Sequence, residues 1–101
     1  MRTQSSGEVL SVTDFTNLGA TNAGLFRDFV RATLKPEHRF IEVDLKQANF
    51  VDSEGLGALI SAHKSVASRG GCVRLIGANA MVIELFRLTR LDQLFEFLPA
   101  T

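Results

Sequence analysis

Two short apolar segments, separated by a stretch with helical periodicity, constrain the fold of this chain more than any other feature. The segments are FIEVDL (40–45), in which apolar and polar residues alternate, and CVRLIG (72–77). Between them, from residue 53 to about residue 68, apolar residues recur at helical spacing, and the glycine pair 70–71 is a helix stop signal. The order strand, helix, strand predicts a unit of an α/β layer.

The rest of the chain continues the alternation. EVLSV (8–12) predicts a short strand, residues 13–22 a polar loop, residues 20–34 a helix that Pro36 ends, and residues 79–90 a third helix. LFEFL (94–98) fits either a last strand or the tail of that helix, and RTQSS (2–6) is only weakly strand-like. The predicted fold class is therefore α/β with a mainly parallel sheet.

Size and charge restrict the function. A chain of 101 residues suits a single domain over residues 1–101, and 11 basic and 11 acidic residues balance to a net charge of zero. We therefore expect no direct binding of nucleic acid. The N-terminus has no apolar signal segment, and no apolar run approaches the ~20 residues of a membrane span, so a cytoplasmic protein is expected.

The junction FVDSEGLGAL (50–59) carries the candidate site. It joins the end of an apolar strand to the start of the second helix, and there Asp52, Ser53 and Glu54 precede Gly55 and Gly57. A serine between two acids at such a place is open to three interpretations. It is a helix cap, a catalytic nucleophile, or a residue that another protein modifies.

A catalytic role is disfavoured, and we expect no enzyme. His63 lies ten residues along the helix from Ser53, roughly 15 Å at the helical rise, and His38 falls in the polar loop PEHR, where we expect it to be solvated. The serine lacks the G-x-S-x-G elbow, and the EGLG glycines lack the lysine of a P-loop. We expect no metal or other cofactor, and Cys72 is interpreted as a small buried residue of a core strand.

The motif D-S-x-G-L-G, together with the preceding apolar strand, the following G-G-x-V-R-L strand and the later LTRLDQLFEF, resembles the STAS domain of anti-sigma factor antagonists. The resemblance covers about residues 40–97 and is weaker before residue 34. It implies a mixed, mainly parallel sheet of four to five strands packed with three to four helices.

The resemblance also implies a bacterial partner switch in transcription regulation. The residue matching the family's phosphorylated serine is Ser53. A serine-kinase anti-sigma factor would phosphorylate it and a serine phosphatase would reverse the reaction; the unphosphorylated form would bind the anti-sigma factor and release the sigma factor. The expected partner-binding residues are Asp52, Ser53, Glu54, Gly55, Leu56, Gly57, Asp14, Thr16 and Asn17. A monomer is favoured. The alternative is an unphosphorylated STAS subunit of a larger complex, such as a lipid-transport ATPase.

Several local questions stay open in the sequence. Asp52 is interpreted either as a cap or as a group that orients Ser53 or binds the kinase, and Leu56 either as core or as docking surface. A phosphate at the helix N-terminus would gain from free N–H groups, while the neighbouring acids would repel it. The loop VTDFTNLGA departs from the family pattern, since Thr16 replaces its aspartate and Asp14 comes two residues earlier.

Overall fold

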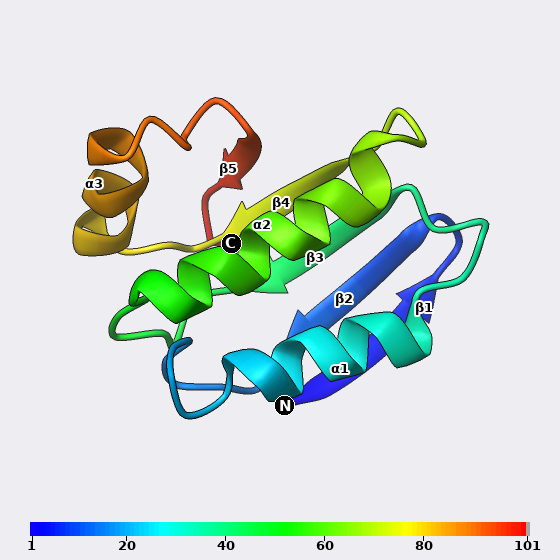
Figure 1. Ribbon diagram of the computed structural model, residues 1–101, viewed down its shortest axis with the longest axis horizontal. Helices are drawn as coiled ribbons and strands as arrows, with labels where there is room; N and C mark the ends of the chain where they lie inside the picture. Colours follow the sequence, from blue (N-terminus) through cyan, green and yellow to red (C-terminus); the bar gives the residue numbers. More distant parts are fainter. Residues whose placement is uncertain (101) are drawn as a thin grey trace.

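A single five-stranded sheet forms the centre of the molecule, with its strands in the order β1-β2-β3-β4-β5 (Figure 1). The computed structural model describes residues 1–100. Strand β1 pairs antiparallel with β2, and every later neighbour pairs in parallel. The strands are β1 (Arg2–Ser6), β2 (Val9–Thr13), β3 (Phe40–Asp44), β4 (Cys72–Ile76) and β5 (Phe95–Leu98).

Three helices occupy the connections between the parallel strands: α1 (Ala23–Thr33), α2 (Ser53–Ala67) and α3 (Ala80–Leu88). Helices α1 and α2 lie side by side across one face of the sheet (Figure 1). Helix α3 lies beyond β4 and packs against β5, where the ring of Phe86 meets Phe95 and Phe97 edge-on, with centroids 5.2 and 5.4 Å apart. All three connecting helices therefore pack on the same face of the sheet.

The core lies between the sheet and the helices. Strand residues alternate between the two faces, and the inward ones pair in register, as Ile41 does with Val73 and Val43 with Leu75, all fully buried. On the opposite face, Arg74 pairs with Glu42 and Glu96 in the same ladder. This difference explains the alternation seen in FIEVDL, since only one face of the sheet is covered by helices in the part of the chain described.

The predicted fold class is confirmed, and the structure resolves both uncertain ends. RTQSS is a strand because the glycine at position 7, with φ of 59°, begins a two-residue hairpin turn that folds it back on β2. Residues 95–98 form the last strand rather than a helix tail. The first helix begins at Ala23, three residues later than expected, because Gly19 and Asn22 are part of the preceding turn.

Two interpretations of single residues are wrong. His38 is fully buried rather than solvated: its Nδ1 accepts a hydrogen bond from the Lys35 N–H at 2.9 Å, and its Nε2 lies 2.6 Å from the Ser5 hydroxyl. Cys72 is only half-buried, because it lies on the face of the sheet away from the helices. Within residues 1–100, no helix has the length and apolar character to cross a membrane.

Candidate functional site

Two loops that are distant in sequence form the candidate site together. The loop after β2 pairs with the segment before α2 through a parallel bridge between Leu18 and Val51. The Leu18 N–H donates to the Phe50 carbonyl and the Asp52 N–H donates back to the Leu18 carbonyl, both at 3.2 Å. One step earlier the Asn49 N–H donates to the carbonyl of Thr16 at 2.9 Å. The two regions that the sequence singled out, residues 14–17 and 52–57, are thus held in a common framework.

Asp52 is the N-cap of α2. Its Oδ1 accepts hydrogen bonds from the backbone N–H groups of Glu54 and Gly55 at 2.9 and 3.0 Å. Its Oδ2 accepts the N–H of Ala20, in the other loop, at 3.0 Å. The capping interpretation of Asp52 is confirmed and that of Ser53 is wrong, because the helix begins at Ser53 itself and the cap precedes it.

These hydrogen bonds determine the charge state of Asp52. The backbone bonds from Gly55 and Ala20, with a further one from Glu54, lower the pKa of the Asp52 carboxyl below its ordinary value. Burial acts in the opposite direction and is outweighed. The carboxylate therefore stays ionised at neutral pH and joins the two loops through three N–H donors.

Two glycines allow the loops to approach each other so closely. A Cβ placed on Gly55 would overlap the carbonyl group of Leu18, and one on Gly19 would overlap the carboxyl group of Asp52. Both positions are buried. The close approach at Gly55 is therefore to a segment of the same chain, and it leaves no room for a side chain.

The site residues separate into an exposed group and a supporting group. Ser53 and Glu54 are exposed at the start of α2, and Asp14 and Thr16 are exposed on the neighbouring loop. Asp52, Asn17 and Gly57 are half-buried. Leu56, whose role was left open, belongs to the core with 9% of its surface exposed, and Gly55 is buried beneath the loop. A partner would contact the exposed group, and the supporting group would hold that exposed group in position.

The Ser53 hydroxyl is free for chemistry carried out by another protein. Within residues 1–100 it has no hydrogen-bond partner, and His63 belongs to the same helix almost three turns further on. His38, the other histidine, is already bonded at both ring nitrogens. Neither histidine is therefore placed to activate Ser53.

Sequence reasoning missed two contributors to the site. The Ala20 N–H, which binds Asp52, comes from the position where the polar loop and the first helix were expected to meet, and no role in the site was predicted for it. Phe50, two residues before Asp52, leaves 44% of its surface exposed and adds an apolar side chain beside the exposed acids. The sequence did contain a signal for Ala20, because the glycine before it, Gly19, is a residue type that permits close approach of the backbone. In the structure Gly19 lies against the carboxyl group of Asp52. Phe50 gave no such signal, because an aromatic residue after a strand is usually expected to be buried.

The fold and the capped junction agree with one family. The chain belongs to the STAS domain family, whose model matches residues 2–101. Among its relatives, the anti-sigma-B factor antagonist of Listeria monocytogenes is 32% identical over 56 residues, which make up 55% of this chain and 49% of that protein. The match thus spans about half the length of that relative.

Solved structures extend the likeness over almost the whole chain. The crystal structure of a candidate anti-sigma factor antagonist from Thermotoga maritima has a TM-score of 0.86 at 26% identity and covers 96% of this chain and 84% of that one. The anti-sigma factor antagonist SpoIIAA, in its unphosphorylated form, has a TM-score of 0.80 at 18% identity and covers 99% of this chain and 87% of that one. The phosphorylated form from Bacillus has a TM-score of 0.76 at 16% identity, covering 99% and 90%. The SpoIIAA likenesses concern the fold.

Proposed function

We propose that this protein is an anti-sigma factor antagonist of a bacterial partner-switching system. In its unphosphorylated form it binds a serine-kinase anti-sigma factor in the cytoplasm and thereby releases a sigma factor. Phosphorylation of Ser53 ends that binding, and a serine phosphatase restores it. The protein acts by binding and signal transduction and has no catalytic activity of its own.

The observation that carries the proposal is the position of Ser53. Its side chain is exposed at the first residue of α2, while the neighbouring Asp52 caps the helix. Because the hydroxyl bonds to no other group within residues 1–100, a phosphate can replace its hydrogen without breaking a hydrogen bond there. That SpoIIAA adopts this fold both with and without phosphate supports the same conclusion.

The expected partner surface surrounds this serine. It consists of exposed and half-buried residues of the two joined loops and the first turns of α2, with Phe50 as an apolar element: Asp14, Thr16, Asn17, Phe50, Asp52, Ser53, Glu54 and Gly57. Gly55 and Leu56 contribute by fixing the backbone beneath it. A phosphate adds about 1.5 to 2 negative charges at pH 7 to a surface that already carries Asp52 and Glu54. Binding then fails through repulsion and the cost of desolvating that charge.

The reaction is an ordinary phosphoryl transfer. The Ser53 oxygen attacks the γ-phosphorus of ATP held by the kinase, a base of the kinase takes the hydroxyl proton, and ADP leaves. The free hydroxyl of Ser53 is the only contribution required from this chain.

The test incubates this protein with ATP and a purified serine-kinase anti-sigma factor. Intact-mass spectrometry with peptide mapping, after incubation with ATP, should find one added phosphate, on Ser53. Ser53→Ala should stay unmodified and bind the kinase, and Ser53→Asp should fold but bind at least about tenfold more weakly, roughly the loss that one close like-charge contact causes.

Ser61→Ala is the matched control, since Ser61 is an exposed serine two turns further along α2. It should be phosphorylated like the native protein. A phosphate on any residue other than Ser53, or equal affinity of the Ser53→Ala and Ser53→Asp variants for the kinase, would contradict the proposed switch. A stable complex with a transport ATPase and no phosphate on Ser53 would instead identify a constitutive STAS subunit.

A further inference from the structure

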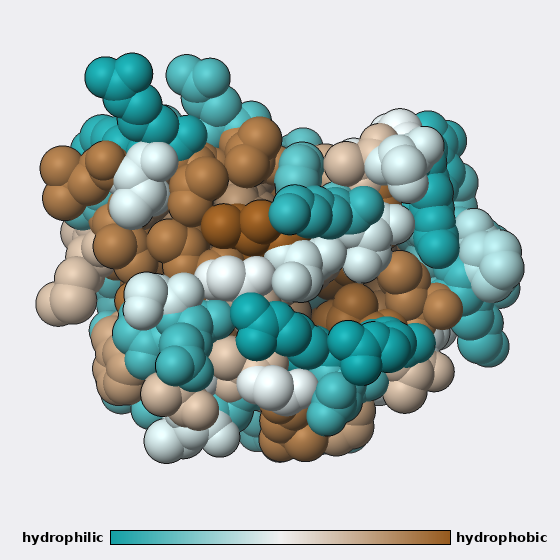
Figure 2. Space-filling model, in the orientation of Figure 1, coloured by the Kyte–Doolittle hydropathy of each residue, from teal (hydrophilic) through white to brown (hydrophobic). Residues whose placement is uncertain are grey.

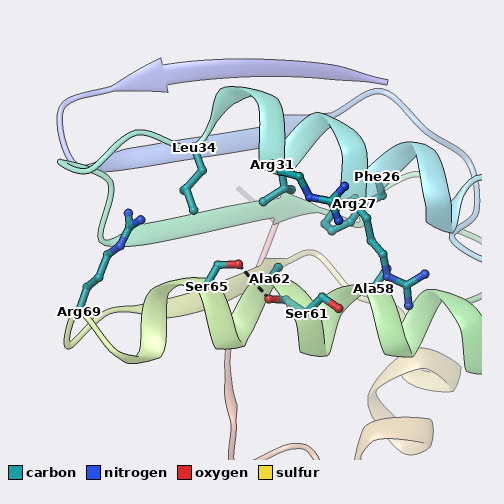
Figure 3. Close-up of a pocket in the computed structure, with 10 residues that line it drawn as sticks. Phe26, Arg27, Arg31, Leu34, Ala58, Ser61, Ala62, Ser65 and Arg69 are labelled. Carbon is teal, nitrogen blue, oxygen red and sulfur yellow. Dashed lines mark hydrogen bonds between the residues drawn. The ribbon is translucent and has the colours of Figure 1, made fainter.

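A groove of about 380 Å³ runs between α1 and α2 on the face that carries Ser53's helix (Figure 3). Hydrophilic side chains lie over the boundary between the two helices (Figure 2). The polar residues of its lining come from both helices and from the end of α2, and they include three arginines and two serines: Arg27, Arg31, Arg69, Ser61 and Ser65. The groove is therefore basic although the chain as a whole is neutral.

Two of the three guanidinium groups are already bound. Arg31 lies 3.6 Å from the carboxylate of Asp28, one turn earlier on α1. The Nη1 of Arg69 donates to the backbone carbonyls of Lys35 and His38 at 2.9 and 2.8 Å. Arg27, which is half-buried, has no ion-pair or hydrogen-bond partner within residues 1–100. Of the groove's arginines it is the one with neither an ion pair nor a hydrogen bond in that range.

The side chain of Arg27 extends from α1 toward the first half of α2 (Figure 3). A Cβ placed on Gly57 would lie 3.1 Å from the Nη2 of Arg27, so the guanidinium rests where position 57 lacks a side chain. Gly57 follows Ser53 by four residues, and residues at that spacing share a helix face with Cβ positions about 5–6 Å apart. The cation thus lies one helical turn from the Ser53 side chain.

A phosphate on Ser53 needs such a cation. Helix N-termini usually bind phosphate through their free N–H groups. Here the N–H groups of Glu54 and Gly55 already donate to Asp52, so these two donors of the first turn of α2 are not free to bind a phosphate. The carboxylates of Asp52 and Glu54, one on each side of Ser53, add repulsion.

We propose that Arg27 binds the phosphate of phosphorylated Ser53 within the same molecule. This inference rests on the proposed function, because it concerns the modified form of the same site. A guanidinium matches the paired oxygens of a phosphate, and the missing side chain at Gly57 leaves the path between them open. Phosphorylation then has two consequences at the docking surface: it adds negative charge, and it withdraws Arg27 from the groove.

The test is independent of any kinase. Phosphoserine is placed at position 53 by genetic incorporation, and the second ionisation of the phosphate is followed by ³¹P NMR as a function of pH. A nearby cation favours the doubly charged phosphate and moves its titration to lower pH. We expect the titration midpoint to lie at lower pH in the native background than in Arg27→Gln, with Arg27→Lys between the two.

Arg31→Gln is the matched control, since Arg31 is the same residue type one turn along α1 and is already paired with Asp28. It should titrate like the native background. Thermal unfolding gives a second readout: phosphorylation should lower the Tm by about 1–8 °C more in Arg27→Gln than in the native background, the effect of one exposed ion pair.

An identical midpoint in the native, Arg27→Gln and Arg31→Gln backgrounds would overturn the inference. An equal shift of the titration midpoint by Arg27→Gln and Arg31→Gln would also overturn it, because the phosphate would then respond to the overall positive charge of the groove and not to Arg27 in particular. Neither result depends on whether a kinase modifies Ser53, so failure here is distinguishable from failure of the proposed switch. Conversely, if Arg27→Gln shifts the midpoint as expected but the kinase does not phosphorylate Ser53, only the proposed switch is refuted.

Discussion

The backbone of Gly55 lies directly against the carbonyl group of Leu18, so closely that no Cβ fits between them. This contact joins the loop after β2 to the first turn of α2, and the N–H of Asp52 donates to the same carbonyl at 3.2 Å. The position of Ser53 relative to the neighbouring loop therefore depends on a glycine two residues away. The relationship leads to a stability prediction that also bears on function.

Gly55→Ala should destabilise the protein by about 1–3 kcal/mol, because the new methyl group forces the loop away from the helix. For a domain of this size each kcal/mol corresponds to a Tm lower by about 4–8 °C. Thermal unfolding followed by circular dichroism measures the loss. The variant should also bind the proposed anti-sigma factor partner more weakly, since the loop that carries Asp14 and Thr16 moves.

Gly24→Ala is the matched control for this substitution. Gly24 is also a helical glycine, but a Cβ placed there meets nothing within 4 Å. Because alanine is the better helix former, the variant should be as stable as the native protein or more stable by up to about 1 kcal/mol. If both alanine variants lost the same stability, a general effect of replacing a helical glycine, and not the Leu18 contact, would explain the loss.

The hydrogen bond between exposed Ser5 and buried His38 should contribute to stability. Because the Nδ1 of His38 accepts the Lys35 N–H, the ring is neutral and its Nε2–H donates to the Ser5 hydroxyl at 2.6 Å. Ser5→Ala removes the acceptor and should cost about 1 kcal/mol or somewhat more. Urea unfolding measures the difference. Ser6→Ala, at the next exposed position of β1, should change the unfolding free energy by less than about 0.5 kcal/mol. Equal effects of the two variants would refute a specific role for the pair.

Much of the fold was predictable because local patterns and the global fold agree. The alternation in FIEVDL predicts a strand, and β3 has nearly the same bounds. The periodicity of residues 53–68 predicts a helix, and α2 ends just before the predicted stop at Gly70 and Gly71. The first strand was less evident, because RTQSS is polar and becomes a strand only by pairing with β2.

The details that depend on distant contacts were not predictable. Asp52 and Ser53 are both good capping residues, and the choice between them follows from the bridge at Leu18 and Val51, which fixes where the extended segment ends. PEHR contains nothing that predicts burial of His38; the hydroxyl of Ser5, 33 positions earlier, supplies the partner that makes it possible. The place of the Arg27 guanidinium over Gly57 likewise follows only from the packing of α1 against α2.

The central ion pair on the open face of the sheet should contribute more than its counterpart on a helix. Arg74 lies 3.2 Å from Glu42 and 3.7 Å from Glu96, covers the ring of Phe40 at 4.1 Å, and has only 24% of its side chain exposed. Arg74→Met leaves two carboxylates without their cation and should cost about 1–2 kcal/mol, with the difference from the native protein shrinking in high salt.

Arg87→Met is the comparison for this pair. Arg87 lies 3.0 Å from Glu84, at least as close as the pair on the sheet, but both side chains are more than half exposed, at 64% and 51%. The loss of an exposed pair should stay below about 1 kcal/mol. Denaturant unfolding at low and high salt separates the two variants. A loss at Arg87 as large as that at Arg74 would mean that distance and not burial sets the contribution.

The stability of the junction should depend on pH through Asp52. The N–H groups of Gly55, Ala20 and Glu54 lower the pKa of its carboxyl below the ordinary 3.8 in the folded state. The stabilisation from the ionised carboxylate is therefore fully present above pH 3.8 and is lost as the pH falls through the lower folded pKa. Asp52→Asn keeps one capping oxygen but loses the charge and the second acceptor, so it should be less stable than the native protein at neutral pH. Urea unfolding of both proteins between neutral pH and about pH 2 measures the difference in their unfolding free energies. This difference should narrow below about pH 4, because the Asp52 carboxyl takes up a proton there and the variant lacks that carboxyl. A difference that stayed constant over that range would show that hydrogen-bond geometry alone, and not the charge of Asp52, holds the loop against α2.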